Sequence, residues 1–257
     1  MSGSISILGS GWLGYPLALR FVQKKYDVKT SCTSEAKLSQ LQAIGTTPFV
    51  VNIDALNKDA DAFLQSELLV INIPADSIKG HRALLQKILG SPVKNVILVS
   101  TTSVYPNENQ IASEDDELPE STRLAIENVF TSNNRIQTTV LRFAGLIGYR
   151  RHPGLFFSGG KNLSNPDAPV NLIHRDDCIE IIGQIIKKNI WNQIFNCCAD
   201  THPSKKEFYT HAAAMLNLPP PSISEQPRGS SKTVSNQKLK SVLKYTFIHP
   251  DLMTIDF

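Results

Sequence analysis

Two short, nearly continuous apolar runs constrain the fold of this 257-residue chain most strongly. They read LLVINI at residues 68–73 and NVILVS at residues 95–100, and a helical pattern of apolar residues at 78–89 lies between them. Strands that are apolar on both sides are typical of the centre of a parallel sheet, because helices cover both of its faces. The chain is therefore expected to be an α/β protein.

The alternation of strand and helix patterns continues on both sides of these runs. Further strands are predicted at 4–8, 27–32, 48–53 and 138–145, and helices at 12–25, 35–44 and 121–131. Six strands in two βαβαβ sets make a doubly wound parallel sheet. We expect this core to occupy residues 1–148.

From about residue 149 the composition changes to Gly, Pro, Asn and Ser, which is typical of loops. A helix that Asp176 or Asp177 can cap then runs to about Lys188. A short strand at 193–199 and helices at about 204–217 and 236–244 complete the chain. Residues 149–257 are expected to return to the core at about 170–198 and to form a small substrate-binding lid.

Composition and charge argue against several classes of protein. Apolar residues make up 41% and charged residues 19%, as expected for a folded domain. A net charge of +3 over the whole chain gives no concentrated basic field, so no nucleic-acid partner is expected. No apolar run approaches the roughly 18 residues that span a bilayer, and the N-terminus lacks a signal-peptide pattern. A cytoplasmic protein without a membrane partner is expected, and a homodimer is left open.

The four cysteines are Cys32, Cys178, Cys197 and Cys198. They form no C-x-x-C motif, and no histidine lies at metal-ligand spacing beside them. Reduced, buried thiols and no metal site are therefore expected.

The sequence SISILGSGWLGYPLALRF places three glycines directly after a strand and at the start of a helix. Gly9 allows the tight turn, Gly11 lets a pyrophosphate approach the backbone, and Gly14 permits close packing of helix on strand. The exposed N–H groups and the helix dipole favour an anion there. A Rossmann-type dinucleotide site is predicted, and the residues expected to contact the cofactor are Gly9, Ser10, Gly11, Trp12, Leu13 and Gly14. The alternative is a glycine-rich turn without a ligand.

The residues after the second strand bear on the choice between NAD and NADP. NAD-specific sites usually have an acidic residue about 20 positions beyond the glycines. Here the segment reads KTSCTSEAKL, with no acid before Glu35. Thr33 and Ser34, with Lys37 as a further candidate, can instead receive a 2′-phosphate. The cofactor is therefore predicted to be NAD(P), with NADP slightly favoured.

Four motifs, in their order, extend this picture over nearly the whole chain: GSGWLG at 9–14, VSTTSVYP at 99–106, LRFAGLIG at 141–148 and VNLIHRDDC at 170–178. Together they resemble the extended branch of the short-chain dehydrogenase/reductase superfamily, which contains nucleotide-sugar epimerases, dehydratases and reductases. The resemblance implies a Rossmann core and an epimerase/dehydratase-like or oxidoreductase activity on a small-molecule substrate.

The resemblance also implies roles for particular residues. Thr101 matches the Ser or Thr that hydrogen-bonds a substrate oxygen near the nicotinamide, and Thr102 is the adjacent alternative. His174 and Asp177 match positions that shape the floor of the substrate site, although a satisfied histidine at a helix N-terminus is an equal alternative. The cofactor-binding residues that it adds are Ile73, Pro74 and Ala75 beside the adenosine, and Arg142 and Ala144 in the segment that passes the nicotinamide.

The chain departs from this family at its catalytic helix. Such enzymes carry Y-x-x-x-K there, in which the lysine holds the ribose and lowers the phenol pKa so that the tyrosine can move a proton. Aligning TRLAIENV with the usual SKLAAEEL puts Arg123 at the lysine and Pro119 at the tyrosine. Arg123 can still reach the ribose hydroxyls, but Pro119 cannot transfer a proton.

The candidates for a substitute proton donor are Tyr105, Tyr149 and His152. Tyr149 is the first choice, although a tyrosine at a strand exit more often packs its ring and exposes its hydroxyl. The neighbouring Arg150, Arg151 and His152, with Lys161, are candidates to bind an anionic substrate group. The alternative for these residues is a solvated loop.

Two functions follow from these observations. The first is an NAD(P)-dependent oxidoreductase or epimerase/dehydratase-like enzyme that acts on a small or nucleotide-linked carbonyl or alcohol. Its Thr101 would polarise the substrate oxygen and its Arg123 would orient the cofactor. The second is a non-catalytic NADP(H) sensor or regulatory protein, which the loss of the phenol at Pro119 favours.

Overall fold

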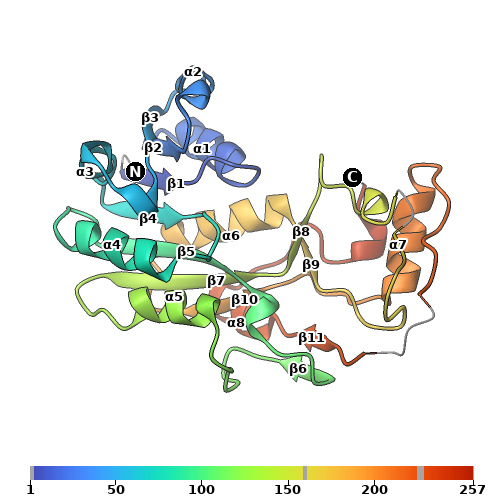
Figure 1. Ribbon diagram of the computed structural model, residues 1–257. Coiled ribbons are helices and arrows are strands. Elements are labelled where there is room, and N and C mark those ends of the chain that lie inside the picture. Colours follow the sequence, from blue (N-terminus) through green and yellow to red (C-terminus); the bar gives the residue numbers. More distant parts are fainter. Residues whose placement is uncertain (1–2, 159–160, 225–228, 257) are drawn as a thin grey trace. The chain divides into compact units, whose positions relative to one another are not determined.

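The computed structural model describes residues 3–158, 161–224 and 229–256 (Figure 1). Its main element is a seven-stranded sheet in the order β10-β7-β5-β4-β1-β2-β3. The strands are β1 (Ser4–Leu8), β2 (Asp27–Cys32), β3 (Thr47–Val50), β4 (Leu68–Ile71), β5 (Asn95–Thr101), β7 (Gln137–Phe143) and β10 (Ile194–Cys197). The chain moves outward from β1 to β3, then returns to the other side of β1 with β4, so the prediction of a doubly wound parallel sheet is confirmed.

The register of the central strands places two turns side by side. Leu8, the last residue of β1, pairs with Ile71, the last residue of β4. The turn that begins at Gly9 therefore starts next to the segment that begins at Asn72. Ligands of open α/β sheets bind at this carboxyl edge, where the strand order reverses.

The helices agree with the sequence patterns except at their ends and in one case. They are α1 (Gly14–Gln23), α2 (Leu38–Ala43), α3 (Lys58–Phe63), α4 (Ile78–Leu89), α5 (Thr122–Thr131), α6 (Arg175–Lys188), α7 (Lys205–Ala214) and α8 (Gln237–Leu243). The short helix α3 was not predicted. Pro16 lies in the first turn of α1, where its missing N–H breaks no intrahelical bond.

The chain divides into two compact units. The first comprises Met1–Ser100, Glu120–Leu141 and Ile182–Ile194, and the second comprises Thr101–Pro119, Arg142–Ile181 and Phe195–Phe257. The two units therefore alternate along the sequence.

One large apolar cluster of the first unit lies on one face of the sheet. Phe63 of α3, Leu84 of α4 and Phe130 of α5 pack in one cluster with alternate strand residues such as Leu69 and Val96. Helices α4 and α5 lie side by side over this face (Figure 1). The intervening strand residues, Ile7, Val70 and Ile97 among them, are also fully buried. This explains why β4 and β5 read as continuous apolar runs.

The second unit contains two small parallel sheets. One pairs β6 (Gln110–Ala112) with β11 (Lys232–Val234), and the other pairs β8 (Gly145–Ile147) with β9 (Leu172–His174). Its apolar cluster joins Ile147 and Leu172 to Phe208 of α7 and to Leu252 and Ile255 near the C-terminus. Within the described ranges, no helix has the length and apolar character needed to cross a membrane.

Candidate functional site

The turn after β1 requires glycine at two positions for steric reasons. Gly9 has a φ of +96°, and a Cβ there would overlap the carbonyl oxygen of Asn72. A Cβ on Gly14 would overlap the carbonyl oxygen of Gly9. Glycine is therefore required at both positions to close the turn and to bring α1 against the strand.

The middle of the turn is open instead. A Cβ on Gly11 would meet no atom within 4 Å, and the residue is exposed. The N-cap residue of α1, Leu13, supplies no side-chain capping hydrogen bond. The hydroxyl oxygen of Ser10 is buried without a hydrogen-bond partner among the residues that the structure describes. An open backbone, an uncapped helix N-terminus and a buried hydroxyl oxygen together fit a phosphate-bearing cofactor.

Two polar residues that the sequence did not single out hold this turn in place. The Ser31 hydroxyl accepts a hydrogen bond of 3.0 Å from the backbone N–H of Gly9. The Asn72 side-chain amide donates one of 3.1 Å to the carbonyl oxygen of Gly9. Both residues lie at or next to the carboxyl end of a strand, but only the sheet order shows that these strands flank β1.

The remaining cofactor candidates of the first unit lie near the same edge of the sheet. Thr33 and Ser34 are exposed immediately after β2, and the Ser34 hydroxyl accepts a hydrogen bond of 3.4 Å from the backbone N–H of Ala36. The Ile73 side chain lies against Gly9, since its Cγ2 atom would be 2.8 Å from a Cβ at Gly9. Pro74 is exposed, while Ala75 and Trp12 are half-buried.

Helix α5, which carries the predicted Arg123, is capped by its own serine. The Ser121 hydroxyl accepts the backbone N–H of Leu124 at 3.2 Å, so that α5 begins after Pro119. Arg123 is exposed in the first turn of α5. One turn further, Glu127 is buried and accepts a hydrogen bond of 2.5 Å from the Ser100 hydroxyl.

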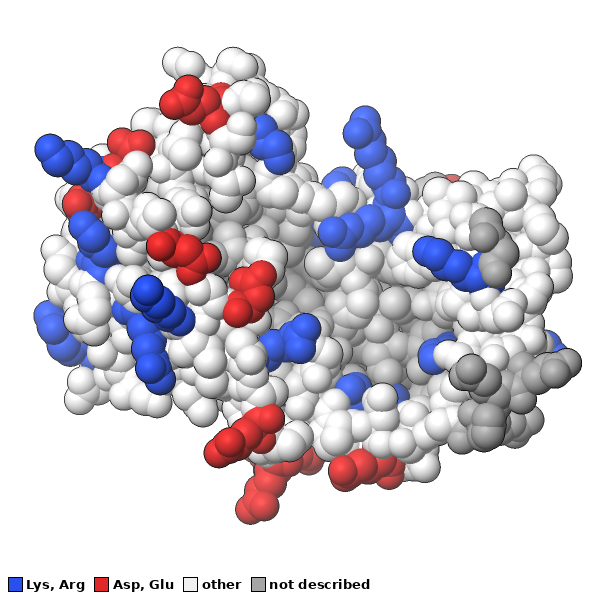
Figure 2. Space-filling view, in the orientation of Figure 1, with Lys and Arg blue, Asp and Glu red and all other residues white. Residues whose placement is uncertain are grey.

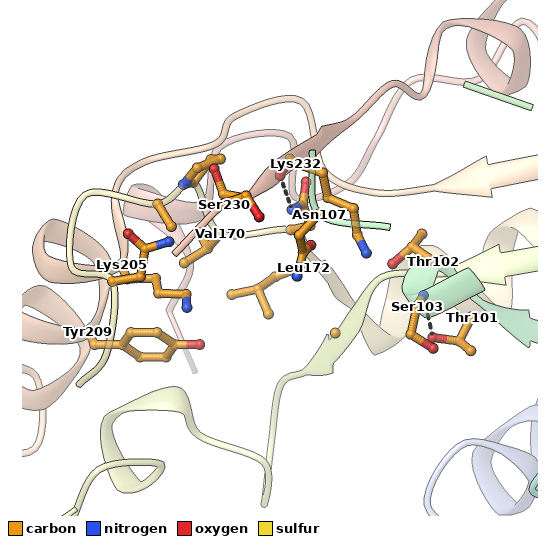
Figure 3. A pocket seen from close by; sticks show the side chains of 16 residues that line it. Thr101, Thr102, Ser103, Asn107, Val170, Leu172, Lys205, Tyr209, Ser230 and Lys232 are labelled. Carbon is orange, nitrogen blue, oxygen red and sulfur yellow. Dashed lines mark hydrogen bonds between the residues drawn. The ribbon is translucent and has the colours of Figure 1, made fainter. Parts of the chain in front are cut away.

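Thr101 and Thr102 line a pocket of about 400 Å³ in the second unit (Figure 3). The Thr101 hydroxyl accepts the backbone N–H of Ser103 at 3.2 Å and caps a short 3-10 helix there. Lys205 and Tyr209 lie at one end of the pocket in Figure 3, and Lys232 lies near the threonines at the other. The other lining residues are Ser103, Asn107, Gly145, Asn165, Ala168, Pro169, Val170, Asn171, Leu172, Ser230 and Ser231.

The lining of this pocket is cationic and rich in hydrogen-bonding groups. It includes Lys205 and Lys232, and no carboxylate occurs among its described lining residues. The Lys232 ammonium donates a hydrogen bond of 2.5 Å to the Tyr105 carbonyl oxygen, and burial lowers the pKa of Lys232. The ammonium and hydrogen-bonding groups of the lining suit a polar ligand with negative charge. Neither lysine was among the predicted substrate residues, because each lies far in sequence from the threonines.

Arg142 is buried, and its side chain belongs to a polar network in the second unit. Its guanidinium donates a hydrogen bond of 2.7 Å to the Tyr105 hydroxyl, which in turn donates one of 2.8 Å to Asn196. Burial raises the pKa of Tyr105, although the neighbouring Arg142 opposes this rise. Ala144 is buried as well. Both side chains are therefore internal.

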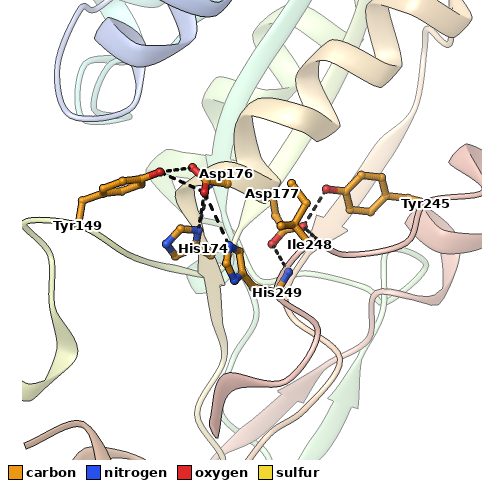
Figure 4. Close-up of polar contacts among 7 residues, drawn as sticks. All are labelled: Tyr149, His174, Asp176, Asp177, Tyr245, Ile248 and His249. Carbon is orange, nitrogen blue, oxygen red and sulfur yellow. Dashed lines mark hydrogen bonds and ion pairs between the residues drawn. The ribbon is translucent and has the colours of Figure 1, made fainter. Parts of the chain in front are cut away.

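His174 and Tyr149 lie together at the start of α6 (Figure 4). Helix α6 begins at Arg175, and the Asp176 backbone N–H donates to Nδ1 of His174 at 3.3 Å. The histidine thus takes the capping position expected for an aspartate. Burial, with the nearby His249 second, lowers the pKa of His174 to about 4.

Tyr149 is half-exposed and donates its hydroxyl hydrogen bond to the Asp176 carboxylate, 2.9 Å from Oδ1. Desolvation, reinforced by Asp176, raises the Tyr149 pKa, so the phenol stays protonated at neutral pH. Asp177 does not face solvent. It is fully buried and accepts hydrogen bonds from the Tyr245 hydroxyl at 2.8 Å and from the backbone N–H groups of Ile248 and His249.

The residues predicted to bind an anion do not share one environment. His152 is buried, and its Nδ1 accepts the backbone N–H of Gly154 at 3.0 Å, while desolvation lowers its pKa. Arg150, Arg151 and Lys161 are exposed. In Figure 2, positive and negative side chains are interspersed on the left of the view, whereas the coloured side chains on the right are mostly positive.

The sheet order and the glycine turn define a Rossmann-type fold. No family model matches the chain. It is 28% identical over 265 residues to Protein YeeZ of Escherichia coli K12, with 96% of each chain covered. The fold is similar to that of a putative NAD-dependent epimerase/dehydratase from Methylobacillus flagellatus, with a TM-score of 0.79, 21% identity and coverage of 98% and 95%. The fold is also similar to that of a UDP-glucuronic acid 4-epimerase from Bacillus cereus, solved in complex with NAD. The TM-score is 0.78 and the identity 18%, and the alignment covers 97% of this chain and 96% of the epimerase. The fold implied by the sequence resemblance is thereby confirmed.

Proposed function

We propose that this protein binds a nicotinamide dinucleotide at the turn formed by residues 9–14. The observation that carries the proposal is the contrast between Gly9 and Gly14, which have no room for a side chain, and Gly11, which opens to free space. Closure of the turn explains the glycines at positions 9 and 14, but it does not explain a glycine at position 11, where a side chain would fit. The buried hydroxyl oxygen of Ser10 supports a phosphate neighbour.

The choice between the two nicotinamide cofactors rests on residues after β2. Thr33 and Ser34 occupy the position where NAD-specific sites usually carry an acid, and both are exposed. A 2′-phosphate can accept hydrogen bonds from both hydroxyls, which favours NADP. The complex of the Bacillus cereus epimerase with NAD supports the wider class of cofactor.

We further propose an oxidoreductase or epimerase/dehydratase-like activity on a nucleotide-linked carbonyl or alcohol. The bound dinucleotide would supply hydride transfer. Thr101 would hydrogen-bond the reacting oxygen, and Arg123 would orient the ribose hydroxyls of the cofactor. Lys205 and Lys232 support an anionic substrate, because the described lining of the pocket has two ammonium groups and no carboxylate, which suits diphosphate or carboxylate oxygens. Tyr149, which stays protonated, is the candidate proton donor.

The second candidate is a protein that binds NADP(H) without turning it over. Its support is the proline at position 119, where the usual tyrosine would stand, together with the engagement of the Tyr149 hydroxyl by Asp176. Such a protein would bind the cofactor at the glycine turn but would catalyse no hydride transfer.

Turnover separates the two candidates. Protein loaded with NADP or NAD is incubated with UDP-glucuronic acid and UDP-glucose, and the products are separated by chromatography while nicotinamide absorbance is followed. The enzyme proposal predicts product formation that Thr101→Ala abolishes with nearly unchanged cofactor affinity. Cofactor binding without any product from a wider panel of nucleotide-linked alcohols and carbonyls favours the sensor.

A further inference from the structure

Three side chains of the second unit bring metal-ligating atoms together at the start of α6. His174 ends β9, Asp176 lies in the first turn of α6, and His249 comes from the C-terminal segment. One ligand atom from each residue lies within 4.8 Å of the other two. We propose that these three residues bind a divalent transition metal ion such as Zn²⁺.

The distances between these atoms are close to those of a metal site. Oδ2 of Asp176 lies 3.5 Å from Nδ1 of His174 and 3.7 Å from Nε2 of His249. Ligands at about 2.1 Å from a tetrahedral ion lie about 3.4 Å from one another. Small side-chain rotations therefore suffice to place all three around one ion. Imidazole and carboxylate ligands in this ratio suit zinc and its neighbours in the first transition row better than Mg²⁺ or Ca²⁺.

The surroundings already orient each ligand. The Tyr149 hydroxyl donates to both oxygens of Asp176, at 2.9 and 3.1 Å, in the manner of an outer partner that orients a metal-bound carboxylate. The long 3.3 Å hydrogen bond from the Asp176 backbone N–H to His174 requires that Nδ1 carry a lone pair. This is the tautomer that can coordinate a metal at Nδ1, and the ion would replace that hydrogen bond.

The third ligand is held by the aspartate next in sequence. The buried Asp177 carboxylate accepts the backbone N–H of His249 at 3.1 Å and that of Ile248 at 2.7 Å. Two adjacent residues of α6 thus have different roles. Asp176 would bind the ion, and Asp177 fixes the segment that carries His249 (Figure 4).

The site is accessible, and it is packed closely on one side. The side chains of Asp176 and His249 are 35% and 24% exposed, so an ion can enter and water can complete its coordination. A Cβ at Gly148 would overlap the His174 ring, so the ring stands against the backbone of this glycine. The Arg175 guanidinium lies 3.8 Å from the centre of the Tyr149 ring, and its positive charge opposes the ion. Affinity in the micromolar range is therefore expected, rather than the tighter binding of a purely anionic site.

Titration of tag-free, metal-stripped protein with Zn²⁺ by calorimetry, and with Co²⁺ by visible absorption, tests the proposal. We expect one ion per chain and a cobalt spectrum of low-symmetry, four- or five-coordinate type. His249→Ala and Asp176→Asn should each abolish the binding, while Tyr149→Phe should weaken it roughly 10-fold. His211→Ala, on α7 and outside the cluster, is the matched control, and circular dichroism checks that each variant folds.

The alternative outcomes are distinct from these. Absence of binding to the wild-type protein, or binding that survives both His249→Ala and Asp176→Asn, overturns the assignment. Equal loss in the His211→Ala control would place the ion elsewhere and overturns it as well. The proposal goes beyond the dinucleotide function and does not depend on it.

Discussion

The hydroxyl of Ser100 donates a hydrogen bond of 2.5 Å to the carboxylate of Glu127, which is 1% exposed. This bond joins the end of β5 to α5 one turn beyond Arg123. Helix α5 is therefore fixed to the sheet by a buried polar contact.

Ser100→Ala is expected to destabilise the first unit. The variant removes one donor from a buried carboxylate, which costs about 1–3 kcal/mol of unfolding free energy. Denaturant unfolding monitored by circular dichroism measures the change. Ser132→Ala, at the exposed C-terminal end of α5, is the control and should change the stability little. Equal stability of the two variants would contradict the structural role of the contact.

Gly14→Ala should also be destabilising, for a steric reason. The new methyl group would overlap the Gly9 carbonyl oxygen, and such overpacking costs about 1–3 kcal/mol. Gly90→Ala is the control, because a Cβ there would lie 3.7 Å from its nearest neighbour, the Lys87 carbonyl oxygen. Urea midpoints that shift equally in the two variants would show that α1 does not pack on the turn as described.

The two lysines of the second-unit pocket predict a loss of affinity for anions. Lys205→Met and Lys232→Met should each weaken binding of UDP-glucuronic acid, by about 1–3 kcal/mol for each charge-assisted contact that is lost. The exposed Lys206→Met is the neighbouring control. Calorimetric titration at two salt concentrations checks the result, since the loss should shrink as salt rises. Unchanged affinity in both pocket variants would place the ligand elsewhere.

The buried cysteines predict a stability change at alkaline pH. Burial raises the pKa of Cys198 from 9.0 to about 12. The unfolded chain therefore releases this proton above about pH 9 while the folded chain keeps it, and the stability falls as pH rises from 9 to 12 by about 1.4 kcal/mol per unit. Below about pH 9 this thiol does not contribute to the pH dependence of the stability, because it is protonated in both the folded and the unfolded chain.

Unfolding free energies of the wild-type protein and Cys198→Ala between pH 8 and pH 11 test this expectation. The variant should lose less stability over that interval, because it lacks the thiol. Parallel pH curves would show that Cys198 is not buried in the protein in solution. All four described cysteines are buried, so a thiol reagent should also react quickly only after unfolding.

The sequence predicted the sheet well because its signals are local. A few adjacent residues are enough to predict the strands β4 and β5 from their apolar runs and the turn at 9–14 from its glycines. The three-residue strands β6, β8, β9 and β11 were missed, since segments of that length have no periodicity to detect.

The parts of the site that were missed depend on residues far apart in the chain. Ser31 and Asn72 support Gly9 only because β2 and β4 flank β1. His249 lies 75 positions after His174 in the numbering, so no ligand spacing could reveal the cluster. The role of Asp177 could not be predicted for the same reason, because its partners Tyr245, Ile248 and His249 lie about 70 positions further along the chain.

Nicotinamide dinucleotide binding at the turn of residues 9–14 is the property on which the proposed function depends, and a fluorescence titration measures it. Wild-type protein and Gly11→Val are titrated with NADPH and with NADH, following the nicotinamide emission. The variant should fold normally, because a Cβ at Gly11 meets no atom within 4 Å. We predict micromolar binding to the wild-type protein, tighter for NADPH, and at least a 10-fold loss in the variant. Binding of neither cofactor, or equal binding by both proteins, would show that this turn is not a nicotinamide dinucleotide site.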